Sequence, residues 1–338
     1  ADRDAADRRG EAWPTWRGDL YLELHRGTFT TQRRLKQLNV AAEEGLREAE
    51  LLSCLRDAEQ AAPLNELWKT LLTNQFHDIL PGSSITEVNE QARDELTQIC
   101  AETSRLAAES LGDGRPAGVW NPASSPVSGV VHSGDGLKLV RGVPPISIAP
   151  LSDAEPSQPV RASASSLDNG IIRIELDDAG EIASLKGSAG DELAQHSMHR
   201  YRLFRDRPHM WDAWDIDPDY DADEIELDRE ADITVTRTDP LRSVIEARRV
   251  IGASSSITTR YILDAESPVL RVEMDIDWNE SRRLLRVEYP TTVTAHPAVC
   301  GTQFGFIERP THPNTSWDRP PLEFPAHSFV PLGPPCPS

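Results

Sequence analysis

The chain has 338 residues, of which 38% are hydrophobic and 27% are charged. This composition is typical of a globular protein of about two to three domains and excludes a fibrous or wholly disordered chain. No window reaches the roughly 18 unbroken apolar residues of a membrane-spanning helix. Its 55 acidic residues outnumber the 35 basic ones, and the net charge is −20. Because such a charge repels phosphate backbones and anionic lipid, we expect neither nucleic acid nor a membrane as a partner.

Apolar residues recur every three or four positions through the first third of the chain, which places them on one side of successive helices. These stripes run through residues 35–55, 64–79 and 88–99. Pro63 separates the first two stripes, and Pro81 with Gly82 ends the second, because neither residue readily continues a helix. The spacing predicts a three-helix bundle over residues 28–115.

The hydrophobic period changes after a turn-rich segment at residues 112–126, GDGRPAGVWNPASSP. Beyond it, apolar and polar residues alternate in short runs, as in half-buried strands, while the proline-rich stretch around residues 143–160 is expected to be a loop or linker. The runs lie at residues 172–176, 182–185, 233–235, 244–245, 257–262, 269–274 and 284–287. We therefore predict an α+β multidomain protein, with a three-helix bundle followed by a large antiparallel β-sandwich domain over residues 116–338.

Residues 74–84 hold a first candidate site, His77 and Asp78 at the end of the second predicted helix. A histidine at a helix C-terminus either compensates the helix dipole or serves as a metal ligand. Asp78 faces the unfavourable end of that dipole, so it needs a cation, a metal or a ligand hydroxyl as compensation. The residues alone leave both readings of His77 open.

Two further segments concentrate aromatic and polar side chains. In residues 204–217, two tryptophans alternate with four acids. Sugar sites use this combination, because an aromatic face covers the C–H side of a pyranose while carboxylates accept its hydroxyl protons. The alternative is an acidic surface loop whose tryptophans are anchored in the core. Residues 304–318 are similar in kind, with a polar cluster that a loop could equally satisfy within itself: Arg309, His312, Asn314 and Asp318.

At these residues the sequence resembles glycosyl hydrolase family 38, the α-mannosidases, in particular the cytosolic and bacterial branch. Four segments carry the likeness and occur in the family's order. They are residues 23–32 (ELHRGTFTTQ), 74–85 (NQFHDILPGSSI), 211–215 (WDAWD) and 309–318 (RPTHPNTSWD). Four long motifs in order are far more specific than any one of them.

The resemblance implies a retaining α-mannosidase built from an N-terminal catalytic α/β barrel, a three-helix bundle and C-terminal β-sandwich domains. In that family a zinc ion binds vicinal mannose hydroxyls, one aspartate attacks the anomeric carbon and a second carboxyl group protonates the leaving oxygen. By its motif, His77 is expected to be a zinc ligand, Asp78 a sugar contact and His25 a wall residue of the mannose subsite. The other predicted substrate-binding residues are Trp211, Asp212, Arg309 and His312.

The catalytic carboxyl groups and the remaining zinc ligands cannot be named in this chain. Retaining glycosidases need two carboxyl groups about 5 Å apart, and a catalytic zinc takes three protein ligands. These groups are expected in a missing N-terminal domain that shares one Zn²⁺ with His77. Residues 1–27 are then the remnant of that barrel with its entry loop, the β domain is truncated at its end, and the chain alone is expected to be inactive.

The sequence therefore predicts a zinc-assisted α-mannosidase acting on α-mannoside oligosaccharides, present as an incomplete chain. The alternative is a non-catalytic carbohydrate-binding or scaffold protein with the same bundle and β-sandwich. Four scattered cysteines without a CxxC pair favour a reducing compartment. A cytoplasmic location is accordingly expected, and a homo-oligomer is left open.

Overall fold

The structure is a computed structural model, and its described residues fall into two compact units. One unit is His25–Thr292, and Val293–Ser338 belongs to the other. Each unit is considered separately below. None of the described helices is long and apolar enough to cross a bilayer. The described residues are 25–54, 61–111, 118–134, 136–212, 214–217, 219–312, 326 and 329–331, so most of the predicted remnant at residues 1–27 lies outside them.

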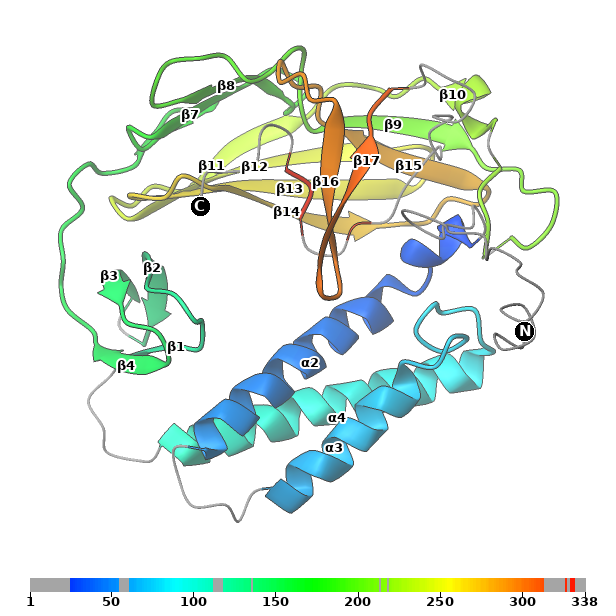
Figure 1. Ribbon diagram of the computed structural model, residues 1–338. Coiled ribbons are helices and arrows are strands. Elements are labelled where there is room, and N and C mark those ends of the chain that lie inside the picture. The colour runs from blue at the N-terminus through cyan, green and yellow to red at the C-terminus, as the bar shows by residue number, and fades with distance from the viewer. Residues whose placement is uncertain are drawn as a thin grey trace, which may run out of the picture. The chain divides into compact units, whose positions relative to one another are not determined.

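The three predicted helices are present and pack side by side (Figure 1). They are α2 (Arg33–Ser53), α3 (Ala61–Asn74) and α4 (Thr86–Leu111), preceded by the short 3-10 turn η1 (Arg26–Phe29). The core of the bundle is made of aliphatic residues from each helix, at the spacing seen in the sequence: Leu35, Leu38, Ala42, Leu46, Ala49, Leu64, Leu71, Ala92, Leu96, Ile99 and Leu106. Apolar stripes of this width are buried only when helices cover one another, which is why the bundle forms.

Helix α3 is shorter than its apolar stripe, so His77 lies beyond the helix rather than in its last turn. After Asn74 the backbone tightens into turns, in which the amide of Phe76 donates to the Thr73 carbonyl (3.2 Å) and the amide of Ile79 to the Phe76 carbonyl (2.9 Å). Ile79 nevertheless packs against the bundle core. The apolar stripe therefore extends past the helix because Ile79 packs against the bundle core from a turn. Since Asp78 does not lie in the last turn of the helix, the helix-dipole argument for Asp78 does not apply.

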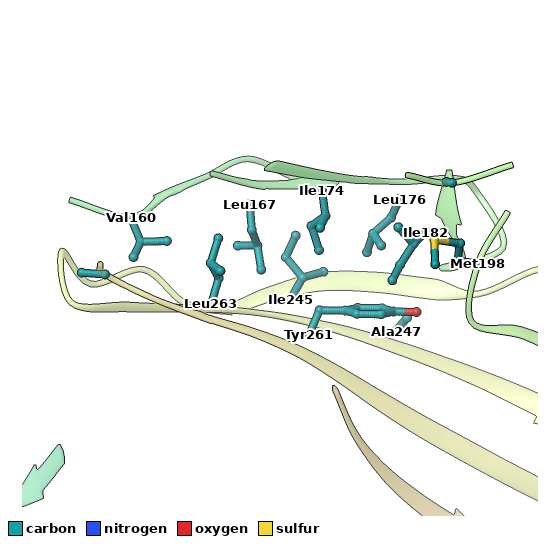
Figure 2. Close-up of a cluster of buried hydrophobic side chains, with 12 residues drawn as sticks. Val160, Leu167, Ile174, Leu176, Ile182, Met198, Ile245, Ala247, Tyr261 and Leu263 are labelled. Carbon is teal, nitrogen blue, oxygen red and sulfur yellow. The ribbon is translucent and has the colours of Figure 1, made fainter. Parts of the chain in front are cut away.

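The predicted pair of packed antiparallel sheets is also present. One sheet has the strand order β5-β6-β7-β8 and the other the order β11-β12-β13-β14. Figure 2 shows their facing side chains, with Leu167 and Ile174 of the first sheet pointing toward Ile245 and Tyr261 of the second. The strands are β5 (Arg161–Ala162), β6 (Ser166–Asp168), β7 (Ile172–Leu176), β8 (Ile182–Gly187), β11 (Asp232–Arg237), β12 (Arg242–Ile251), β13 (Ser255–Asp264) and β14 (Leu270–Asp277). Because successive side chains of a strand point to opposite faces of its sheet, every second residue of each strand faces this core.

Other strands extend the β part beyond the two predicted sheets. A third sheet has the order β10-β9-β15, and the pairs β1-β4 and β2-β3 precede the sandwich. The prediction of a loop over residues 143–160 is wrong for the part that forms β4. The residues of β4 pair with those of β1, for example Ile148 with Trp120. These strands are β1 (Gly118–Asn121), β2 (Val127–Ser133), β3 (Gly136–Val143), β4 (Ser147–Pro150), β9 (Arg200–Arg205), β10 (Glu224–Ile225) and β15 (Arg283–Glu288). Proline is tolerated in β4 because the strand lies at the edge of a two-stranded pair.

A chain of polar side chains runs through the interior of the β part. His199 is 0% exposed; its Nδ1 lies 2.5 Å from the Tyr289 hydroxyl and its Nε2 2.8 Å from the Tyr201 hydroxyl, which lies 2.7 Å from the hydroxyl of Thr259. Burial, together with the nearby charge of Arg249, lowers the pKa of His199 to about 4. The imidazole is therefore neutral at pH 7 and can accept one hydrogen bond while donating another.

The second unit contains a β-hairpin of β16 (Pro297–Thr302) and β17 (Gly305–Pro310). Cys300 pairs with Ile307 and Ala298 with Arg309 in its register. Arg309 is buried, as are Ala298, Val299 and Cys300 on the facing strand. Arg309 thus lies buried near the open end of the hairpin, opposite Ala298.

Candidate functional site

Residues 25–32 form a compact entry to helix α2. The amide of Thr28 donates to the His25 carbonyl (3.1 Å), and the Thr31 hydroxyl donates to the Gly27 carbonyl (3.0 Å). His25 itself has a left-handed backbone with φ 67° and an exposed side chain. The hydrogen bonds of Thr28 and Thr31 explain why the first motif is polar. The side chain of His25 is exposed at the start of this segment.

The second element is a tight turn to which residues 211, 212 and 214–216 belong, called here the tryptophan turn. The amides of Trp214 and Asp215 both donate to the Trp211 carbonyl, at 2.8 and 3.1 Å. Trp211 is 66% exposed and Asp212 is exposed as well, with Nη2 of Arg282 3.4 Å from its Oδ2. Of the two readings of this segment, the exposed Trp211 fits a contact surface, whereas the partly buried Trp214 anchors the turn.

These two elements meet. The amide of Gly27 donates to the Trp214 carbonyl at 3.0 Å, and the His25 and Trp214 rings pack edge to face at a centroid distance of 4.6 Å. Beneath them Arg26 is buried and donates to the Ile216 carbonyl. His25 and the tryptophan turn, nearly two hundred residues apart in sequence, therefore share one surface.

The third element is the loop that carries His77 and Asp78. The His77 side chain is 75% exposed, its Nε2 lies 3.4 Å from Asp78 Oδ2, and its ring is 4.2 Å from that of Phe76. Lys36 braces the loop, because its Nζ donates to the Leu80 carbonyl at 3.1 Å and to the Pro81 carbonyl at 3.0 Å. An imidazole and a carboxylate are thus held side by side on a fixed loop, open to a ligand.

The same loop also closes onto the start of α2. Gly82 has a φ of +80°, and a Cβ there would lie 2.6 Å from Cβ of Gln32. Only glycine accommodates both that conformation and that approach. The loop of the second motif is therefore held against the start of α2 by Lys36 and Gln32. The first motif, which leads into the same helix, is held by its own 3-10 turn.

Electrostatics around the tryptophan turn are dominated by acids. Burial raises the pKa of Asp206, and the nearby charges of Asp212 and Asp217 raise it further. Nδ1 of His209 contacts Oδ2 of Asp217, and this hydrogen bond raises the pKa of His209. The surface beside Trp211 therefore suits a hydroxyl-rich ligand and disfavours an anionic one.

The remaining predicted residues lie in the other unit. Arg309 is buried in β17, and His312 follows that strand with a buried Nδ1 that has no hydrogen-bond partner among the described residues. The His296 and His312 rings are 6.3 Å apart. Asn314 and Asp318 fall outside the described residues, so the fourth motif stays a prediction. Sequence reasoning did not single out Arg26, Lys36 or Trp214 as site residues, although Arg26 and Trp214 stand inside the quoted motifs.

The described residues do not by themselves build a metal centre. Within the described part of the chain there is no group of three His, Cys, Asp or Glu side chains that could hold a metal ion. A catalytic zinc takes three protein ligands and an open position. His77 fits one position of such a set as an imidazole ligand, and the rest of the set is not among these residues.

Comparison with known proteins defines the class to which this fold and site belong. The family described as "Alpha mannosidase middle domain" matches residues 23–113, and "Glycosyl hydrolases family 38 C-terminal domain" matches residues 167–333. Together these matches cover most of the chain. The chain belongs to glycosyl hydrolase family 38, and it carries the middle domain and the C-terminal domain of that family.

Individual relatives agree with this assignment. The chain is 34% identical to Alpha-mannosidase 2C1 of Homo sapiens, over 97% of this chain and 35% of that protein. It is 26% identical to Alpha-mannosidase of Saccharomyces cerevisiae, over 95% of this chain and 31% of the relative. The chain thus spans about a third of the length of these curated relatives.

Solved structures show the same fold. A protein in glycosyl hydrolase family 38 from Enterococcus faecalis superposes with a TM-score of 0.71 at 15% sequence identity, covering 92% of this chain and 50% of that one. An α-mannosidase from Enterococcus faecalis V583 superposes with a TM-score of 0.65. At this level of identity the likeness concerns the fold alone, namely the helical bundle followed by the β domain.

Proposed function

We propose that this chain is the middle and C-terminal part of a zinc-assisted retaining α-mannosidase and forms one wall of its sugar site. The observation that carries the proposal is the His77–Asp78 pair, exposed on a loop that Lys36 holds to the same helix entry as His25. The matched family and the relatives named above support it. The substrates are α-mannoside oligosaccharides.

Each residue has a role suited to its chemistry. The Asp78 carboxylate accepts hydrogen bonds from sugar hydroxyls, and such charge-assisted bonds are the stronger ones. Trp211 offers an aromatic face to the apolar side of a pyranose, while His25 and Asp212 lie at the edge of the same surface. Arg309 and His312 are proposed as further substrate contacts.

The zinc ion is proposed to be held by His77 together with ligands from the N-terminal region of the enzyme. A neutral imidazole on a braced loop is an ordinary zinc ligand, and a metal held from two domains needs one of them to present its ligand rigidly. When bound, the ion supplies Lewis acidity toward vicinal hydroxyls. The residues of this chain bind and orient the sugar, and the reacting carboxyl groups are expected upstream.

Two substitutions in the complete enzyme test this proposal. His77→Ala should lower bound zinc and hydrolysis of an aryl α-mannoside together, by at least about 10- to 100-fold, since losses of this order already follow when only the outer-shell partners of metal ligands are removed. Asp78→Asn should keep the zinc but weaken sugar binding and turnover. The control is His196→Ala, which removes another exposed histidine of this chain. Full zinc occupancy and wild-type rate in His77→Ala would contradict the ligand role.

The isolated 338-residue chain should show no α-mannoside hydrolysis above buffer, because it lacks a recognisable nucleophile and acid. Zinc-dependent hydrolysis by the pure chain would mean that two of its own carboxylates form the catalytic pair. If the complete protein binds mannosides but never hydrolyses them, the alternative of a non-catalytic carbohydrate-binding or scaffold protein holds. The cytoplasmic location and a homo-oligomer stay predictions.

A further inference from the structure

We propose that Arg26 is a positioning residue that locks the tryptophan turn against the entry of the helical bundle, so that Trp211 and Asp212 form a fixed part of the sugar site. Their role toward sugar rests on the proposed function. The lock itself rests on contacts between residues 25–27 and residues 214–216, which join the bundle entry to a loop of the β domain.

The Arg26 guanidinium is buried between these two segments, and the residue is only 4% exposed. Its Nη2 donates to the carbonyl oxygen of Ile216, and its Nε lies 3.7 Å from Oδ1 of Asp215. Nε and Nη1 have no hydrogen-bond partner among the described residues. A buried charge that loses its partners is strongly destabilising. The arginine therefore depends on the tryptophan turn staying in place, and the turn is held by the arginine.

Gly27 shows how closely the two segments approach. Its amide donates to the Trp214 carbonyl at 3.0 Å. A Cβ at this position would lie 3.2 Å from the Trp214 carbonyl carbon and 3.3 Å from the Asp215 amide nitrogen. Such contacts are tighter than ordinary van der Waals packing, so any larger side chain would push the turn outward.

Each of the two joined elements contains a residue with a left-handed backbone, His25 in one and Trp211 in the other. Among the described residues other than glycine, seven have a positive φ, and three of these belong to the site: His25 at 67°, Gln32 at 51° and Trp211 at 66°. A left-handed conformation at a non-glycine residue persists only where surrounding contacts over-determine it, and such residues gather at functional sites. Two of the three are residues that the motifs marked as sugar contacts.

The lock is separate from the brace on the metal loop. Lys36 holds residues 80 and 81, whereas Arg26 holds residues 215 and 216. Loss of Arg26 should therefore loosen the sugar-contacting turn and leave the His77 loop in place. A residue that merely stabilised the whole fold would disturb both.

The experiment compares Arg26→Met, Arg26→Lys and the exposed control Arg33→Met in the complete enzyme. Chymotrypsin cleavage after Trp211 and Trp214, followed by mass spectrometry, reports how firmly the turn is held. Zinc content is measured alongside, with KM and kcat for an α-linked mannobiose. We expect Arg26→Met to speed cleavage several-fold and to raise KM about 10-fold with less change in kcat and unchanged zinc, since loss of positioning weakens binding. Arg26→Lys should restore part of the protection, because its ammonium can still donate to the Ile216 carbonyl.

Wild-type cleavage rate and KM in Arg26→Met would overturn the proposal, as would a loss of zinc parallel to the loss of sugar binding. If Arg26→Met does not fold, Gly27→Ala carries the same test, because its methyl group presses on the tryptophan turn while the charge remains. If the unaltered enzyme hydrolyses no α-mannoside, the proposed function fails, but the cleavage rates still decide whether Arg26 holds the turn.

Discussion

The core between the two packed sheets and the surface at the start of α2, called here the entry surface, differ in the exposure of their large side chains. In the core, Tyr261 and Leu167 are completely buried between two sheets. At the entry surface, Trp211 and His77 are mostly exposed, and the buried Arg26 and the half-buried Lys36 hold the backbone behind them. The difference predicts that substitutions in the core change stability, whereas substitutions of the exposed residues change chemistry. Substitutions of Arg26 or Lys36 should change both.

The largest stability effect is expected from Leu167→Ala. This residue lies at the centre of the packed sheets in Figure 2, so its truncation leaves a cavity and should lower the free energy of unfolding by about 2–5 kcal/mol. Val269→Ala, at an exposed position of the same domain, should change it by less than about 0.5 kcal/mol. Urea unfolding of both variants checks the difference, and similar midpoints would contradict the assignment of Leu167 to the core.

The pH dependence of stability should report the buried His199. Its pKa is lowered to about 4 in the folded chain, so the unfolded chain binds more protons between pH 6.5 and 4. Stability should therefore be complete above about pH 6.5 and fall by up to about 3 kcal/mol as the pH drops toward 4. Unfolding curves across this range check the slope. In His199→Gln the slope should flatten, and an unchanged slope would assign it to other groups.

A smaller effect is expected from Lys36→Met, which removes the brace on the metal loop. Hydrogen bonds from a charged group to the Thr31, Leu80 and Pro81 carbonyls are lost, and the free energy of unfolding should fall by about 1–2 kcal/mol. Lys69→Met is the control, because Lys69 is exposed and pairs only with Glu66 of its own helix among the contacts described. Faster zinc release from Lys36→Met than from the control would sharpen the comparison, whereas equal release would show that the loop holds its shape unaided.

The smallest stability effect is expected from Trp211→Ala. Because this side chain is mostly solvated, stability should change by less than about 0.5 kcal/mol, while affinity for an α-mannoside should fall about 10-fold through the loss of the aromatic face. Val250→Ala truncates an exposed apolar side chain that lies in none of the four motifs and should leave both unchanged. Thermal unfolding and mannoside titration measure the two quantities. A large stability loss in Trp211→Ala would place this residue with the core.

Much of the fold was predictable because periodicity is a local property. The stripe from Leu35 to Leu52 and the alternation around Ile174 reflect burial on one face of a helix or strand, and each appears in the structure as expected. The end of α3 was not predictable in this way, since Ile79 continues the stripe while packing from a turn. Strand β4 was hidden by flanking prolines, and only its pairing with β1 shows it.

The sequence by itself determined the two types of core and, through its four motifs, the family and the candidate residues His25, His77, Asp78 and Trp211. Only the tertiary structure decided that the first and third motifs touch, through Gly27 and Trp214, and that Arg26 lies buried beneath them. The physical reason is the sequence separation over which each kind of contact acts. Helix and strand periods arise between near neighbours, whereas a contact across 190 positions depends on how the bundle entry and the β domain fold together, and no local pattern records it.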